Sequence, residues 1–201
     1  MARAVHAPAG QLDQEGTTMW SRRRERAEDA VRADAVQAAS ALTVHLQGGG
    51  NLVPVQAGGV ALAAGEVAFA DVACSAARFF GTEVDYPTSA SGYFEDHPTF
   101  GRRWVSNGRL DARRRQEAED AALPQWRDHT AARVVLTSTG VRLLPLRARE
   151  WMPFDHALLT GVAAEPSAVV LSYSTCAPLL LSGPAAPWLG VAIEHLRHGA
   201  A

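Results

Sequence analysis

Short apolar runs separated by polar turns fill the C-terminal third of the chain. Residues 133–136 (RVVL) and 141–146 (VRLLPL) flank a polar segment that contains Gly140, and this pattern predicts a β-hairpin. Residues 168–172 (AVVLS) and 178–181 (PLLL) predict a second pair of strands. Short strands separated by polar turns indicate a curled sheet of antiparallel strands.

A helix is expected to close this region. Gly183 and Pro184 end the last strand, and Pro187 suits a first helical turn, where its missing N–H would be unpaired in any case. Apolar side chains then recur at spacings of one, three and four: Trp188, Leu189, Ala192 and Leu196. This stripe predicts a helix that plugs one open end of the sheet, with Trp188 as its central side chain.

The N-terminal quarter has a weaker pattern. Residues 1–16 are polar and rich in Gly and Ala, which predicts disorder. A helix is expected over residues 20–46, ended by the glycines at 48–50. Its apolar stripe consists mostly of Ala, so it should add little to a core. We therefore expect residues 1–50 to form a disordered tail and helical extension, and residues 51–201 to form the domain.

Two further strands are expected at the start of this domain. Residues 67–73 alternate in polarity and predict the first strand. Residues 78–86 (RFFGTEVDY) predict another strand, in which Gly81 would mark a bulge.

The middle of the chain has the pattern of an insertion, placed at about residues 87–125. Residues 88–108 are rich in Ser, Gly, His and aromatic side chains, which predicts a long loop. Residues 110–123 predict a solvent-exposed helix with Arg–Glu pairs four residues apart, ending before Pro124.

Composition narrows the functional classes. The chain has 201 residues, 47% of them hydrophobic and 20% charged, as expected for one soluble domain with appendages. A formal net charge of −2 gives no general attraction to nucleic acid or anionic membranes. All 19 Lys and Arg residues are Arg. The absence of Lys excludes Schiff-base enzymes and the P-loop signature.

Cysteine usage and apolar runs favour a cytoplasmic protein. Cys74 and Cys176 are too few for a disulfide framework or a four-thiolate zinc site. The N-terminal segment lacks the features of a signal peptide. The most apolar stretch, residues 60–77, contains Glu66 and Asp71, so no transmembrane helix is expected.

Several short motifs lie in the expected turns and strands of this domain. They are Gly65-Glu66, residues 134–137 (VVLT), 142–144 (RLL), 151–154 (WMPF), 181–188 (LSGPAAPW) and 125–129 (QWRDH). Together these motifs resemble bacterial PH-like domains, and most closely an uncharacterised set of small actinobacterial proteins.

The resemblance covers residues 60–199. It implies a mainly β, α+β fold: a PH-like open barrel of short antiparallel strands, capped by a C-terminal helix and preceded here by the helical extension. The first hairpin lacks the Lys/Arg pairs that clamp phosphoinositide phosphates. A protein partner is therefore expected ahead of a lipid headgroup.

Functional side chains are densest in residues 93–104. Tyr, Phe, Trp and Arg are the usual anchors of protein interfaces, and the segment offers a candidate binding set of these types: Tyr93, Phe94, Arg102, Arg103 and Trp104. The same segment contains carboxylates beside a histidine, which defines an alternative catalytic set: Glu95, Asp96, His97 and Arg102. Neighbouring residues in a loop seldom converge on one point, so the binding interpretation is favoured.

Three other combinations have simpler explanations. His195 and His198 share a helix face, as a metal pair would, but positive charge near a helix C-terminus explains them better. The residue types of a catalytic triad occur in Ser172, Ser174, Thr175, Asp155 and His156, but no nucleophile-elbow motif surrounds any of these serines. The arginines at 22–24 and 113–115 are followed by acidic residues that cancel their field.

The sequence thus predicts a non-enzymatic PH-like binding or scaffolding module in the cytoplasm. We expect a protein partner, with no cofactor, no metal and no nucleic acid, and the pattern is compatible with a homodimer. The alternative is a small hydrolase or metal-dependent enzyme that uses the 93–104 segment.

Overall fold

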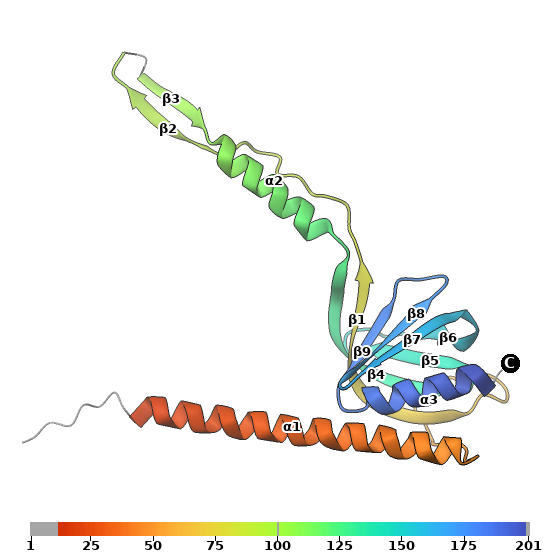
Figure 1. Ribbon diagram of the computed structural model, residues 1–201. Coiled ribbons are helices and arrows are strands. Elements are labelled where there is room, and N and C mark those ends of the chain that lie inside the picture. Colours follow the sequence, from red (N-terminus) through yellow and green to blue (C-terminus); the bar gives the residue numbers. More distant parts are fainter. Residues whose placement is uncertain (1–11, 100, 200–201) are drawn as a thin grey trace, which may run out of the picture.

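The computed structural model describes residues 12–99 and 101–199 (Figure 1). Its elements follow in the order α1 (Leu12–Gln47), β1 (Ala68–Phe80), β2 (Gly92–His97), β3 (Gly101–Ser106), α2 (Gly108–Ala122), β4 (Gln125–Thr137), β5 (Gly140–Pro145), β6 (Met152–Asp155), η1 (His156–Leu158), β7 (Leu159–Glu165), β8 (Ala168–Tyr173), β9 (Leu179–Ser182) and α3 (Ala186–Gly199).

A seven-stranded antiparallel sheet with the order β6-β5-β4-β1-β9-β8-β7 forms the body of the protein. It consists of two runs of neighbouring strands, β1-β4-β5-β6 and β7-β8-β9, which are joined where β1 pairs with β9. The predicted hairpin is confirmed as β4–β5, with Leu136 opposite Val141, and the second pair is confirmed as β8–β9. The fold class is therefore α+β with a C-terminal helix.

The core lies between the sheet and α3. Its fully buried large side chains come from both runs of strands and from α3, and they include Leu136, Val141, Leu171, Leu179, Leu181, Leu189 and Ile193. Val134, Val135 and Leu136 are consecutive in β4 and have no exposed surface, so both faces of the strand are covered here and its sequence is a continuous apolar run.

The centre of the α3 stripe differs from the expectation. Leu189 and Ile193 have no exposed surface, whereas Trp188 is only partly buried. The choice of Trp188 as the central side chain was wrong, because the stripe runs from Leu189 at steps of three and four, which leaves Trp188 at its margin. Pro187 does lie in the first turn, as predicted.

The two strands expected at residues 67–73 and 78–86 are one continuous strand, β1, which ends at Phe80. Small residues between these segments hid the continuity, since they alternate little in polarity. The irregularity lies not at Gly81 but between Ala76 and Arg78, where β4 contains one residue more than β1. There Asp128 adopts a φ of 57°.

The long loop expected at residues 88–108 is also wrong, because most of it forms the β2–β3 hairpin, in which Phe94 lies opposite Trp104. Solvent reaches both faces of this ribbon, so its sequence lacks the alternation of a half-buried strand. The helix expected at 110–123 is confirmed as α2, which has no buried residue and is capped by the Asn107 side chain.

Together, residues 81–124 form an arm that projects from the sheet between β1 and β4 (Figure 1). The paired ends of β1 and β4 form its base, α2 its middle and the β2–β3 hairpin its far end. The predicted insertion is thus a structured projection.

Helix α1 packs against α3 through its C-terminal half, where Ala35 and Ala39 are buried and Leu42 and Leu46 contact the core. Its N-terminal half extends past the sheet (Figure 1). The disorder expected for residues 1–16 is wrong for residues 12–16, which begin this helix, while residues 1–11 lie outside the described part. Within that part, no helix is long and apolar enough to span a membrane.

Candidate functional site

The β2–β3 hairpin gathers the candidate binding residues at the far end of the arm. Phe94 and Trp104 pair across the strands with their ring centroids 5.0 Å apart and the rings inclined at 69°. The Arg102 guanidinium lies 4.6 Å from the centroid of the Phe94 ring. Phe94 remains 57% exposed and Trp104 47% exposed. We call Phe94, Trp104 and Arg102 the aromatic face.

The two remaining binding candidates lie on the opposite face of the ribbon. Tyr93 pairs with Val105 across the strands, and Tyr93 is 56% exposed. Next to this pair, Arg103 Nη2 lies 2.9 Å from Glu95 Oε2 in an exposed ion pair. Successive side chains in a strand point to opposite faces, so the five predicted residues divide between two surfaces.

A glycine fixes the position of Trp104. A Cβ atom placed on Gly92 would lie 2.5 Å from Cζ2 of the Trp104 ring and 2.4 Å from the carbonyl oxygen of Val105. The indole therefore rests directly on the Gly92 backbone, which only glycine allows. Gly92 thus makes room for the exposed indole against the backbone of the neighbouring strand.

Polar contacts tie the extended segment 82–91 to α2. The Ser91 backbone N–H donates to Asp111 Oδ1 at 2.7 Å, and Arg114 donates to Ser91 Oγ at 2.5 Å. The bond from the Ser91 N–H, with that from its hydroxyl, lowers the pKa of Asp111. Tyr86 donates its hydroxyl to Glu119 at 3.3 Å. These contacts hold the two sides of the arm together.

Arg127 anchors the arm to the sheet. Its guanidinium donates to the carbonyl oxygens of Phe80 at 3.0 Å, of Leu123 at 3.3 Å and of Ala121. These groups include carbonyls at the C-terminal end of α2, which have no partner within the helix. The motif at 125–129 that carried part of the family resemblance thus contains the anchor of the arm.

The alternative catalytic residues do not converge. Glu95 and Asp96 are consecutive in β2 and face opposite sides of the ribbon, and Glu95 pairs with Arg103. Arg102 lies over Phe94, and the side chain of His97 falls outside the described part. General acid–base catalysis needs groups that meet at one substrate atom. Among the described residues no three potential ligands group as a metal site would require.

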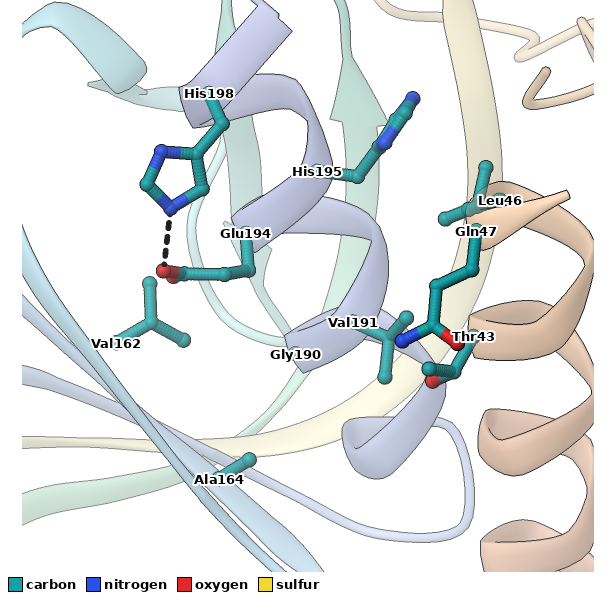
Figure 2. Close-up of a pocket in the computed structure, with 10 residues that line it drawn as sticks. All are labelled: Thr43, Leu46, Gln47, Val162, Ala164, Gly190, Val191, Glu194, His195 and His198. Carbon is teal, nitrogen blue, oxygen red and sulfur yellow. Dashed lines mark hydrogen bonds and ion pairs between the residues drawn. The ribbon is translucent and has the colours of Figure 1, made fainter. Parts of the chain in front are cut away.

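A groove of about 530 Å³ lies between the C-terminal end of α1, α3 and β7 (Figure 2). His198 Nε2 lies 3.0 Å from Glu194 Oε1, whereas the His195 side chain points in a different direction (Figure 2). The two histidines therefore do not form a metal pair. His198 and Arg197 occupy the last turn of α3, where positive charge is favourable.

The residues that could form a catalytic triad make other contacts instead. His156 is buried, with Nε2 3.2 Å from the Thr137 carbonyl oxygen, and burial lowers its pKa. Asp155 Oδ1 lies 3.5 Å from Arg142, and Ser174 donates to the Leu158 carbonyl at 3.4 Å. These contacts connect turns of the sheet and form no nucleophile–base pair.

Sequence reasoning missed a buried cluster around Glu66, whose side chain is 1% exposed. Glu66 Oε1 accepts from Thr137 Oγ1 at 2.5 Å, Thr139 Oγ1 at 2.6 Å and Arg142 Nη2 at 2.9 Å, while Oε2 accepts from the Ala63 N–H at 2.8 Å. Burial raises the pKa of Glu66, but these donors outweigh it and lower the pKa to about 2. The cluster fixes the β4–β5 turn.

No protein-family model matches the chain. A search of curated proteins also finds no similar sequence.

Proposed function

We propose that this protein is a non-enzymatic binding or scaffolding module that engages a protein partner through the end of its arm. The observation that carries the proposal is the aromatic face, where exposed Trp104 and Phe94 pack edge to face beside Arg102. Aromatic and Arg side chains dominate the binding energy of protein interfaces, and side chains that already pack on one another lose less entropy on binding.

The charges of the hairpin favour a protein over a membrane or nucleic acid. Glu95 and Asp96 balance Arg102 and Arg103, so the hairpin has no net attraction for a polyanion. These charged residues also lie nearer the hairpin turn than the Phe94–Trp104 pair does. A bilayer approached by the end of the arm would meet charges first, whereas a protein surface can dock sideways on the aromatic face.

The strand order supports a PH-like open barrel as the scaffold. Four strands and then three form two runs that meet at β1 and β9, and α3 follows the last strand and covers the core. On this proposal the arm is an insertion between the first two strands of the barrel.

The thiols support a cytoplasmic location. Cys74 and Cys176 are both unbridged, and burial raises the pKa of Cys74 to about 11, which keeps it protonated and inert.

The test is a quantitative comparison of proteins captured from the native host. Wild type and a Phe94→Ala/Trp104→Ala variant are compared, with Leu146→Ala as the control, because Leu146 is 76% exposed on the body of the protein. We expect at least one protein to be retained by wild type and the control and lost from the double variant. Its affinity, measured with purified partner, should fall at least tenfold for the double variant. Equal retention by all three proteins would contradict the proposal.

A further inference from the structure

A second cavity lies at the base of the arm, away from the aromatic face. Its volume is about 390 Å³, within the range of small-molecule sites. Buried Leu143 and Leu179 and the partly exposed Met152 contribute apolar walls. Arg78, Asp128 and Arg147 supply charged groups, and the imidazole of His129 also lines the cavity.

Arg78 is the unusual member of this lining. It is partly buried, its Nε donates to the Ala177 carbonyl at 3.2 Å, and its guanidinium lies 5.4 Å from the centroid of the Phe154 ring. No carboxylate of the described residues forms an ion pair with it, as is also true of Arg127 at the base of the arm, whereas the partly buried Arg133 and Arg142 have carboxylate partners. Arg78 thus has a carbonyl and a ring as neighbours but no carboxylate partner, which leaves its charge available to a ligand anion.

The backbone shapes the rim of the cavity. Beside the extra residue of β4, Asp128 has a φ of 57°. Residues other than glycine adopt this backbone conformation uncommonly. Such bulges re-aim side chains and occur next to functional sites. Asp128 opposes two arginines, Arg78 and Arg147, which leaves an excess of one positive charge among these three residues. That balance suits a monoanion better than a phosphate dianion.

We infer that this cavity binds a small amphipathic carboxylate, with its carboxylate on Arg78 and its hydrocarbon chain against Leu143, Leu179 and Met152. The site is separate from the protein-binding surface proposed above, because it depends on no residue of the β2–β3 hairpin. It gives the protein a second function, the recognition of a hydrophobic acid.

Isothermal titration calorimetry of the full-length protein with decanoate, below its micelle concentration, tests the inference. Decan-1-ol has the same chain without the charge, while acetate and inorganic phosphate have charge without the chain. We expect decanoate to bind at one site per chain, and the other three probes to bind at least tenfold more weakly. An affinity for decan-1-ol or phosphate equal to that for decanoate overturns the inference, as does no binding of decanoate.

Two variants locate the site. Arg78→Gln removes the charge and should weaken decanoate binding about ten- to a hundredfold, leaving decan-1-ol unaffected. Met152→Trp fills the cavity and should abolish binding, whereas the matched control Leu146→Trp lies outside the lining and should bind as wild type does. Thermal melts establish that each variant is folded. Unchanged decanoate binding by folded Met152→Trp would place the ligand elsewhere, and unchanged binding by folded Arg78→Gln would place its carboxylate elsewhere; either result overturns the inference.

Discussion

At the scale of single residues, Glu66 retains its charge although its side chain is almost entirely buried. The hydroxyls of Thr137 and Thr139, the Arg142 guanidinium and a backbone N–H surround the carboxylate. Removing one member of such a cluster leaves the others buried without a partner, which costs more than the net contribution of any single hydrogen bond.

Glu66→Gln should therefore destabilise the protein by about 3 kcal/mol at neutral pH. The folded-state pKa of Glu66, about 2, lies below the ordinary value of 4.5, so its contribution is complete above pH 4.5 and is lost as the pH falls towards 2. The difference between wild type and variant in urea unfolding should shrink over that window. Glu165→Gln, an exposed change at the end of β7, is the control. A difference that stays constant from pH 7 to pH 2 would contradict this account.

The sequence revealed these residues to different degrees. Phe94, Trp104 and Arg102 could be singled out by type alone, because interface anchors are few in kind. Gly65-Glu66 could be placed in a turn, but its partners lie some seventy residues away and only the pairing of β1 with β4 brings them near. Likewise, nothing in a local pattern indicates that Gly92 supports the Trp104 ring.

At the scale of elements, burial decided which strands could be predicted. The β4–β5 and β8–β9 pairs are buried at the core and were predicted correctly. The β2–β3 hairpin has two solvated faces and was taken for a loop. In α3 the apolar stripe was predicted, but its centre was set at the largest side chain and not at the buried Leu189.

Leu189→Ala should cost about 2–5 kcal/mol, the range for emptying a fully buried leucine site, because Leu189 has no exposed surface. Trp188→Ala should cost less, since part of that side chain already contacts solvent. Urea midpoints of the two variants, at equal m-values, rank these costs. An equal or larger loss for Trp188→Ala would mean that the packing of α3 differs from the one described.

At the scale of the whole molecule, the protein is a body with a structured projection. The arm packs mainly on itself, and α2 has no buried residue. The sequence indicated an insertion at this place and the exposed character of its helix. It could not indicate the direction of the arm, which the paired ends of β1 and β4 and the Arg127 contacts determine.

Replacing residues 82–123 by an Asn-Gly turn should leave a folded body. Phe80 and Gln125 are paired neighbours, so a short turn can join the two strands with little change of register. We expect thermal unfolding in a single cooperative transition, as in wild type. We also expect the variant to lose the protein partner that wild type retains. A non-cooperative melt would show that the arm belongs to the folding unit.

The position of the arm also affects the route by which the chain folds. The β1–β4 pairing is the longest in the sheet, yet its strands are separated along the chain by residues 81–124. Closing a longer flexible loop costs about 0.6 kcal/mol for each doubling of its length. Local formation of α2 and the β2–β3 hairpin removes most of that freedom and brings Phe80 towards Gln125. The arm, which we propose binds a protein partner, thus also shortens the search for the β1–β4 pairing.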